Sequence, residues 1–376
     1  MAIYLDCNAT TPMEPSVASL VLRFMEKDYG NAASPIHDYG LFARAAVEHA
    51  RMLVGKVVGA RPDEVLFTSG ATESNNLAIF GLADAGKKSR RRHILTTAIE
   101  HKAVLEPFEV LSRRGFEVEY LPVDSGGRLL AEQLARALRS DTLLVSTMHV
   151  NNETGVLQPL DEVASILAGH DALWHVDASQ GYGKELDLLR NQRIDMMSIS
   201  GHKIYGPKGI GALIVRKREG SFPPLQPLLF GGGQEQGLRA GTLPVPLIVG
   251  LGEAAKLALQ DYSHRREKCL AFRQEVIRAL DLLATEQNSD ECWTLPHMIN
   301  VSLAGVSSDQ AINKLKNLIA LSSTSACTSH TRTPSHVLIA MGKTPSQVES
   351  SLRFSWCHMT PDVDWAAVIK ILRNIS

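Results

Sequence analysis

The chain has few cysteines, and no two of them stand close together. Five occur among 376 residues, and none forms a CxxC pair. They are Cys7, Cys269, Cys292, Cys327 and Cys357. An odd number of scattered thiols argues against a disulfide framework and a structural zinc site, and it is typical of a reducing compartment. We therefore expect no metal site, and we expect at least one thiol to matter for its reactivity.

Long apolar runs are also missing. No segment approaches the roughly 18 consecutive apolar residues that a membrane-spanning helix needs. The first residues, MAIYLDCNAT, place an acid where a secretory signal would carry basic residues and then an apolar stretch. We therefore expect a soluble protein of the cytoplasm, with no signal peptide and no membrane partner.

The chain carries almost no net charge. Lys and Arg number 39 and Asp and Glu number 40, which gives −1. A near-neutral balance lacks the basic footprint of a nucleic-acid-binding surface, so no direct contact with nucleic acid is expected. The one basic run, KKSRRRH at 87–93, is interpreted as a solvated loop between a helix and a strand.

What the sequence does contain is an alternation of strand-length apolar runs with longer helical patterns. Strands are expected at 65–68, 93–96, 117–123, 142–150, 172–177, 196–200 and 211–215. Such alternation predicts an α/β fold with a mostly parallel sheet covered on both faces. A Pro- and Gly-rich segment, 222–246, is expected to be a structured loop, and 250–281 one long helix leading to a smaller α/β unit.

Polar segments follow several of these strands, at the edge of the sheet where ligands bind. One of them, SGATES at 69–74, follows a strand and opens a helix. Gly70 permits a tight turn, and the backbone N–H groups and the Thr72 hydroxyl can then hold an anion at the helix N-terminus. By itself this segment would more often be an ordinary helix cap.

An acid and a lysine complete the pattern. Asp177 closes the apolar strand ALWHVD, and Lys203 lies just past another strand, in SISGHK. A buried acid needs a cationic partner, and a lysine among small residues at a sheet edge is suited to form a Schiff base. Pyridoxal phosphate needs an anion site, an acid for its pyridinium N–H and an amine for its aldehyde. The combination therefore predicts this cofactor.

Nine ordered motifs carry a resemblance to a known family. They are YLDCNATTP, TSGATESNNLA, EHKAVL, MHVNNETG, HVDASQ, SGHKIYGPKGIGAL, GGGQEQGLRAGT, SSTSACTS and SLRFS. In order and spacing they resemble the cysteine desulfurases of the NifS/IscS-like group, which are class V aminotransferases among the fold-type I enzymes that use pyridoxal phosphate.

The resemblance implies an architecture. It implies a fold-type I transferase with a large domain, residues 14–255, that binds pyridoxal phosphate on a mostly parallel seven-stranded sheet. The smaller α/β domain would combine residues 1–13 with 256–376 and carry a loop, about 321–333, that holds the catalytic cysteine.

The resemblance also implies roles for individual residues. Lys203 would hold the cofactor covalently, Asp177 would pair with its ring nitrogen, and Gln180 with its ring hydroxyl. His101 would stack on the ring and act in catalysis. The phosphate would be held by Ala71, Thr72, Ser200 and His202, and by Thr242 of the neighbouring subunit in a homodimer. Asn152 would contact both cofactor and substrate, and Arg353 would bind the substrate carboxylate.

The activity implied is conversion of L-cysteine to L-alanine, with Cys327 as the nucleophile that accepts the sulfur as a persulfide. A sulfur-acceptor protein would be the partner. Relatives that serve iron–sulfur scaffolds have a longer C-terminal tail, so we expect an acceptor in tRNA or DNA sulfur modification, with an iron–sulfur scaffold as the other option.

Two other functions stay open. One is a selenocysteine lyase or related β-eliminating enzyme, and the other is an inactive scaffold that binds a partner. Intact Lys203, Asp177, His101, Arg353 and Cys327 argue against both.

The sequence departs from the family pattern at Thr324, where glycine is usual, and at Cys7. The other thiols outside the loop, Cys269, Cys292 and Cys357, are interpreted as structural.

Overall fold

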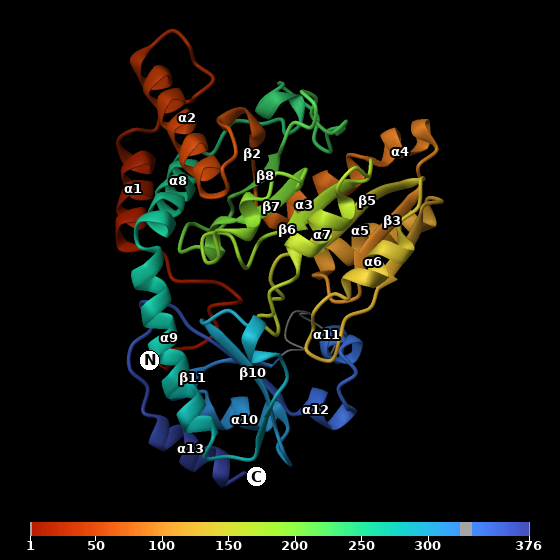
Figure 1. The fold of residues 1–376 in the computed structure, drawn as a ribbon. Coiled ribbons are helices and arrows are strands. Elements are labelled where there is room, and N and C mark those ends of the chain that lie inside the picture. The colour runs from red at the N-terminus through yellow and green to blue at the C-terminus, as the bar shows by residue number, and fades with distance from the viewer. Residues whose placement is uncertain (1, 324–332, 376) are drawn as a thin grey trace.

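A seven-stranded sheet forms the larger part of the molecule (Figure 1). The computed structural model describes residues 2–323 and 333–375. The strand order is β2-β8-β7-β6-β5-β3-β4, and β8 alone runs antiparallel to its neighbours. The strands are β2 (Val65–Thr68), β3 (His93–Thr97), β4 (Glu117–Leu121), β5 (Thr142–Met148), β6 (Leu173–Asp177), β7 (Met196–Ser200) and β8 (Gly211–Val215). The predicted mostly parallel sheet is confirmed.

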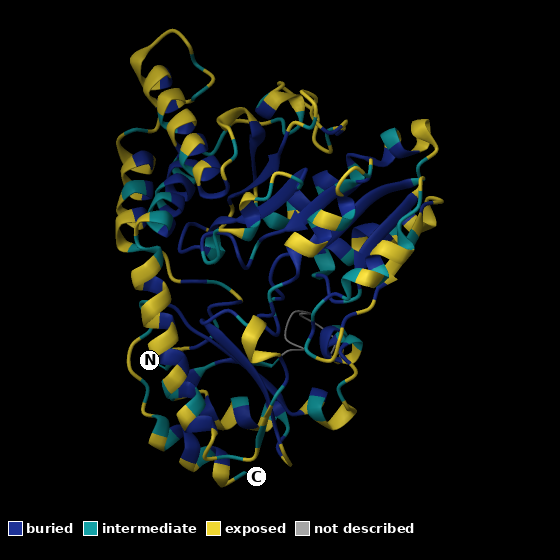
Figure 2. Ribbon diagram, viewed as in Figure 1, coloured by how far each residue is buried: buried dark blue, intermediate teal, exposed yellow. Residues whose placement is uncertain are grey.

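Helices cover both faces of this sheet. Except for the edge strand β4, its strands are buried on both sides, so successive residues contribute to different cores (Figure 2). Val65 and Phe67 pack with one core, and Leu66 between them packs with the other. The first core includes α1 (Pro15–Glu26), α2 (Asp38–Val58), α6 (Ala131–Ala137), α7 (Leu160–Leu167) and α8 (Val245–Gln260). The second includes α3 (Ala71–Phe80), α4 (Ala83–Ser89) and α5 (Lys102–Arg113).

The prediction of a single helix over 250–281 is wrong. The chain forms α8, which ends at Gln260, and α9 (Tyr262–Leu280). The break falls at Asp261, whose φ of −102° and ψ of 9° leave the helical range. A short carboxylate competes with the backbone for hydrogen bonds inside a helix, which makes aspartate a residue of helix ends.

A second group of strands lies below the large sheet in Figure 1. Four of them form an antiparallel sheet in the order β12-β13-β10-β9, and β1 pairs with β11 in parallel. These strands are β1 (Ile3–Tyr4), β9 (Thr285–Gln287), β10 (Met298–Leu303), β11 (Ile319–Ala320), β12 (Ser322–Ser323) and β13 (Ser351–Ser355). The accompanying helices are α10 (Ser308–Leu315), α11 (His336–Ala340), α12 (Pro345–Glu349) and α13 (Trp365–Arg373).

Residues from both chain ends share the core of this second group. Leu5 packs there with Phe354, Trp356 and Leu372. The domain boundaries expected at 13/14 and 255/256 stay a prediction, because residues 5–11, which we call the N-terminal strap, contact both groups of strands. Cys7 N–H donates to the Ser355 carbonyl at 3.1 Å, and Thr11 N–H donates to the His202 carbonyl at 3.0 Å.

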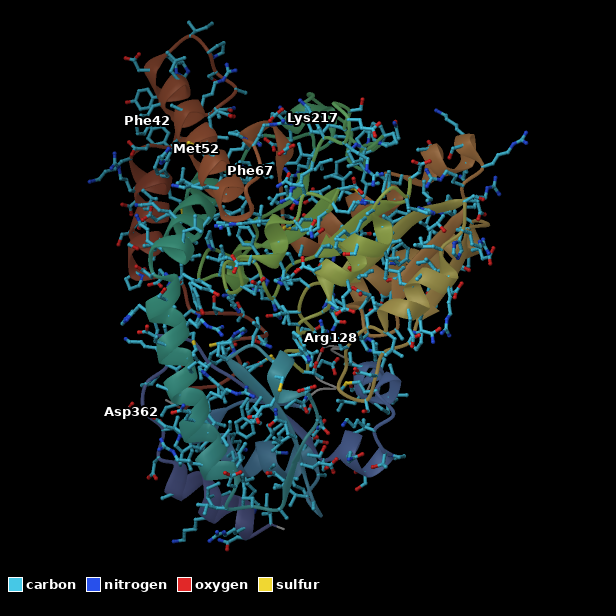
Figure 3. All side chains as sticks on the ribbon, viewed as in Figure 1. Phe42, Met52, Phe67, Arg128, Lys217 and Asp362 are labelled. Carbon is cyan, nitrogen blue, oxygen red and sulfur yellow. The ribbon has the colours of Figure 1, made fainter. Side chains whose placement is uncertain are left out.

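A side-chain contact also joins the two groups. The guanidinium of Arg128, labelled in Figure 3, lies 3.6 Å from the ring centroid of Trp293 and donates to Glu162 at 3.1 Å. No helix in the described part of the chain is long and apolar enough to cross a membrane.

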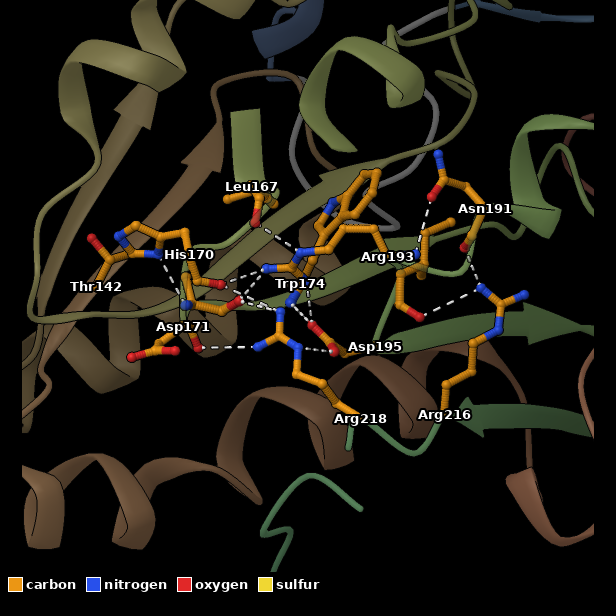
Figure 4. A network of polar contacts seen from close by, with 12 residues as sticks. Thr142, Leu167, His170, Asp171, Trp174, Asn191, Arg193, Asp195, Arg216 and Arg218 are labelled. Carbon is orange, nitrogen blue, oxygen red and sulfur yellow. Dashed lines mark hydrogen bonds and ion pairs between the residues drawn. The ribbon is translucent and has the colours of Figure 1, made fainter. Parts of the chain in front are cut away.

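The amino ends of the central strands are held by charge pairs (Figure 4). Buried Asp195, just before β7, accepts from Arg193 at 2.7 Å and lies 3.3 Å from Arg218. It also accepts the backbone N–H of Trp174 in β6 at 2.7 Å. Arg193 and Trp174 lie at the amino ends of β7 and β6, and Arg218 follows the antiparallel strand β8 at the same edge of the sheet. The opposite edge, at the carboxyl ends of the parallel strands, is left for a ligand site.

Buried histidines predict how stability depends on pH. Burial lowers the pKa of His175 in β6 to about 4, from 6.5. Between those values the unfolded chain binds a proton that the native state does not, so the free energy of unfolding falls as pH drops from 6.5 to 4. In His175→Asn, we expect the free energy of unfolding to depend less steeply on pH near pH 5, by about 1.4 kcal/mol per pH unit. Urea unfolding at several pH values measures this slope. The exposed His264→Asn is the control, and an equal decrease there would contradict the assignment.

Candidate active site

A cavity of about 560 Å³ lies at the carboxyl ends of β6 and β7. The sequence-predicted residues that line it are Ala71, Thr72, His101, Asn152, Asp177, Gln180, Ser200, His202, Lys203 and Arg353. Among the residues that it describes, the structure therefore brings together every predicted site residue except Thr242. Sequence reasoning missed other lining residues, chiefly Asn8, Thr10, Asn75, Ser179 and Lys208.

The N-terminus of α3 forms one end of the cavity. Gly70 precedes the helix with φ 152° and ψ 179°, a conformation that residues with a side chain rarely adopt. A Cβ on Gly70 would lie 3.6 Å from the Ser200 hydroxyl, which shows how closely the helix start approaches the end of β7. Free N–H groups and the helix dipole favour an anion at this point.

The helix start is tied to the long loop at 222–246. Glu73 accepts the Ser69 N–H at 2.7 Å and lies 3.0 Å from Arg239 of the loop. Its pKa is lowered although burial alone would raise it, because Ser69 and Arg239 favour the carboxylate. The same loop inserts buried Glu235 against Arg51 at 2.7 Å. The loop is structured, as predicted.

Asp177 lies at the end of β6 with both carboxylate oxygens engaged. Asn75 Nδ2 donates to Oδ2 at 2.7 Å, and Ser179 donates to Oδ1 through its hydroxyl and, at 3.0 Å, through its N–H. Asn75 belongs to α3, one turn after Ala71 at its start, and its side chain is buried. The sequence could have indicated Asn75 through its spacing, because it lies four residues after Ala71 in α3 and so on the same side of the helix as the anion site.

Lys203 follows β7, and its ammonium meets the N-terminal strap. Nζ donates to the carbonyls of Asn8 and, at 3.0 Å, Ala9. Two residues later, Tyr205 has φ 65°, in the left-handed region where an aromatic residue is an outlier. The strap stabilises this turn, because Thr11 Oγ1 accepts the Tyr205 N–H at 3.0 Å. Strain of this kind gathers at functional sites.

Two histidines in the cavity are held neutral. Burial lowers the pKa of His101, and Lys203 lowers it further. His101 Nδ1 accepts the Ala103 N–H at 3.1 Å at the start of α5, which leaves Nε2 as the protonated ring nitrogen. Burial, followed by Lys203 and Lys208, lowers the pKa of His202 to about 4.

Arg353 lies at the other end of the cavity, on β13. Its Nη2 lies 2.7 Å from Asp6 Oδ1, and its Nη1 donates to the Asn152 carbonyl at 3.0 Å. Arg353 Nε is buried without a hydrogen-bond partner among the described residues. Asp6 also accepts from Ser322 of β12 at 2.8 Å, so one carboxylate holds the arginine and the strand beside it.

Thr242 is exposed and does not line the cavity of its own chain. Cys327 and Thr324 lie outside the described residues. The described chain on each side of the segment 324–332 is anchored beside the cavity. Before it, Ser322 is in register with Arg353. After it, His336 Nε2 lies 2.9 Å from the carbonyl of Glu100, the residue next to His101.

The sequence profile of the aminotransferase class-V family matches residues 3–365. The chain therefore belongs to the aminotransferase class-V family. Within that family its relatives are cysteine desulfurases. It is 44% identical over 374 residues to the mitochondrial cysteine desulfurase of Arthroderma benhamiae, covering 99% of this chain and 74% of that protein. It is 43% identical to cysteine desulfurase IscS of Dechloromonas aromatica, covering 100% and 92%.

Solved structures agree with these relatives. A NifS-like protein superposes with a TM-score of 0.91 at 37% identity, covering 100% of this chain and 99% of that one. DndA from Streptomyces lividans gives 0.83 at 48% identity, covering 93% and 98%. SspA in complex with cysteine gives 0.83 at 37% identity, covering 94% and 98%. The expected family and fold are confirmed. The names of some relatives place them in mitochondria, so a cytoplasmic location stays a prediction.

Members of this family use pyridoxal phosphate, and the cavity fits that group. The helix N-terminus of α3 suits its phosphate and the carboxylate of Asp177 suits its pyridinium N–H. Gln180 Nε2 donates to the Asn8 carbonyl at 2.9 Å, while its buried Oε1 has no hydrogen-bond partner in the described chain. A ring hydroxyl would supply the donor that this oxygen lacks.

The contact between Asn75 and Asp177 leads to a prediction about cofactor affinity. Asn75→Leu removes a 2.7 Å hydrogen bond to a carboxylate and leaves Asp177 less fixed. Hydrogen bonds to charged groups contribute about 1.5–3 kcal/mol, so we expect the Kd for pyridoxal phosphate to rise at least about tenfold. The neighbouring Asn76→Leu is the matched control, since Asn76 does not line the cavity and its Nδ2 donates to the Thr72 backbone carbonyl. Titration of the visible absorbance measures both, and equal affinities would contradict the role of Asn75.

Proposed function

We propose that the chain converts L-cysteine to L-alanine and transfers the sulfur to Cys327, from which an acceptor protein takes it. The observation that carries the proposal is the convergence of Lys203, Asp177 and Arg353 on one cavity. These residues supply an amine, an acid and a cation within one site. The relatives named as cysteine desulfurases, and a solved relative with bound cysteine, support the same reaction.

Pyridoxal phosphate would supply an electron sink for the substrate's α-carbon when bound. Asp177 would hold the ring nitrogen protonated, and Asn75 and Ser179 would fix the carboxylate that does so. Ala71, Thr72, Ser200 and His202 would receive the phosphate at the start of α3. Lys203 would hold the cofactor covalently.

Arg353 would bind the substrate carboxylate. Its Nη1 and Nη2 are already fixed by Asn152 and Asp6, and its Nε is buried without a partner among the described residues. A carboxylate beside Nε would satisfy this donor and bring a second negative charge to the guanidinium. Because the Arg353 guanidinium is held in place before substrate arrives, its side chain loses little rotamer freedom on binding.

Lys203 would move the α-proton once its amine is released. Its Nζ rests on two strap carbonyls, which hold it at the edge of the cavity. His101 is neutral with its proton on Nε2, so it can donate a hydrogen bond toward the sulfur or the ring. Cys327 would attack the substrate sulfur as a thiolate, from a segment whose two ends are anchored at Arg353 and near His101.

The remaining proposals concern partners. A homodimer would bring Thr242 of the neighbouring subunit to the phosphate, which agrees with the exposure of Thr242 on its own chain. The sulfur acceptor would be a protein with its own thiol, in nucleic-acid sulfur modification or iron–sulfur assembly. A selenocysteine lyase would not need Cys327, and an inactive scaffold would need neither Cys327 nor Lys203.

Cys327→Ser separates these functions. We expect the variant to bind pyridoxal phosphate and change its visible absorbance on addition of cysteine, because neither step uses the thiol. Persulfide and alanine formation should fall at least about a hundredfold, since a serine hydroxyl is a far weaker nucleophile than a thiolate. Lys203→Ala is the comparison and should lose the absorbance change as well. Wild-type persulfide formation in Cys327→Ser would reject Cys327 as the acceptor.

Arg353→Lys tests the carboxylate site. Lysine keeps the positive charge but loses the planar fork and both of its anchors. We expect KM for cysteine to rise about ten- to a hundredfold with a smaller change in kcat. Asp6→Asn, which leaves Arg353 in place but weakens one anchor, should raise KM less. A fall in kcat at unchanged KM in both variants would show that Arg353 does not bind the substrate.

A further inference from the structure

Two thiols far apart in the sequence meet beside the cavity residue Asn8. Cys7 of the strap and Cys357, which follows β13, pack against each other and against Tyr205. Both are buried, with 1% and 4% of their surface exposed. Backbone contacts hold them there, since Cys7 N–H donates to the Ser355 carbonyl at 3.1 Å and Cys357 N–H donates to the Thr360 hydroxyl at 2.9 Å. The desulfurase reaction proposed above uses neither thiol.

The surroundings favour a thiolate on Cys357. The Cys7 thiol packs against Cys357. This neighbour, followed by the Met359 N–H and the Thr360 hydroxyl, lowers the pKa of Cys357 to about 6 although burial opposes the shift. Thr360 Oγ1 lies 3.7 Å from the sulfur. The same pairing raises the pKa of Cys7, which keeps its proton.

A lysine nitrogen that is buried lies near the pair. Lys184 Nζ is sealed from solvent, has no hydrogen-bond partner in the described chain, and interacts electrostatically with Cys7, Cys269 and Cys357. Burial lowers its pKa, and the three thiols oppose that shift. Lys184 can therefore donate to a thiolate on either cysteine, and a low-pKa thiolate beside a second thiol is the usual equipment of a redox-active pair.

We propose that Cys7 and Cys357 are a modification site, a redox-active dithiol that an oxidant of the peroxide class converts to a disulfide. Cys357 attacks one oxygen of the peroxide, the O–O bond breaks, and a sulfenic acid and water result. The Cys7 thiol then attacks that sulfur, the S–O bond breaks, and a second water leaves. The two sulfurs lose two electrons, the peroxide gains them, and the two thiol protons end in water.

The disulfide would alter the active site through the strap. Asn8, next to Cys7, accepts at its carbonyl from both Lys203 and Gln180, and its Nδ2 donates to the Asn152 carbonyl at 3.1 Å. Replacing a thiol contact by an S–S bond of about 2.05 Å draws Cys7 toward Cys357 and moves Asn8 with it. This consequence, unlike the dithiol itself, rests on the proposed function, because it concerns Lys203 as the cofactor's amine.

The dithiol is tested by peptide mass spectrometry on cofactor-loaded Cys327→Ser protein, which removes the catalytic thiol from the assay. After hydrogen peroxide treatment, we expect a Cys7–Cys357 crosslinked peptide that dithiothreitol abolishes. Cys7→Ala should give no crosslink and leave Cys357 as a sulfenic acid that a dione reagent traps. Lys184→Gln should slow crosslinking at least about threefold. Cys269→Ala, which removes a neighbouring buried thiol, is the matched control and should crosslink as before.

Two results would overturn the proposal. One is that exposed Cys292 is fully oxidised while Cys7 and Cys357 both stay reduced. The other is a crosslink from Cys357 to Cys269. Thermal unfolding of each variant checks that it is folded, and Cys7→Ser replaces Cys7→Ala if the latter is not.

The consequence for the site is measured separately, as the rate at which the cofactor-free form takes up pyridoxal phosphate. We expect the oxidised form to be several-fold slower and dithiothreitol to restore the rate. An unchanged rate with the crosslink present would refute the coupling through Asn8. No uptake by the reduced form would instead refute the proposed function.

Discussion

The contact between Lys203 and the strap carbonyls of Asn8 and Ala9 is the constraint on which the site depends. The strap is fixed to β13 by Cys7 and to the residues after β7 by Thr11, so one short segment sets the distance between Lys203 and Arg353. A single strap residue, Asn8, forms hydrogen bonds with Ser355, Asn152, Gln180 and Lys203. Backbone carbonyls serve this purpose well, because they accept from an ammonium without adding a charge that would compete with Asp177.

Much of the fold was predictable because its signals are local. The strands at Val65–Thr68, Met196–Ser200 and Gly211–Val215 have the predicted bounds, since short apolar runs between polar loops leave little choice. The break at Asp261 was not predicted, because helices lie on both sides of it and only the backbone of that residue leaves the helical range. The reversed direction of β8 depends on pairing with two distant strands, which no local pattern encodes.

The site residues also separate into those with local sequence signals and those that depend on distant partners. Asp177 and Lys203 could be found from sequence because each closes a strand, and strand ends of a parallel sheet meet. Asn75, Asp6 and Asn8 act through partners that are distant in sequence, such as Asp177 at 102 positions and Arg353 at 347 positions. From the sequence, Cys357 is interpreted as a structural thiol and Cys7 only as a departure from the family pattern, for the same reason. Their contact exists only because the strap crosses the end of β13.

The two kinds of thiol in this chain have opposite requirements. A sulfur-transferring cysteine must reach both a substrate and an acceptor, so it belongs on a connecting segment, and the described ends of the segment around Cys327 are fixed on either side of the cavity. The Cys7–Cys357 pair gains its chemistry from being held still, with donors and Lys184 arranged around it. Burial keeps a molecule the size of cysteine away from that pair. Hydrogen peroxide is far smaller than cysteine. The same strap that fixes Lys203 therefore keeps a reactive pair out of reach of the enzyme's own substrate.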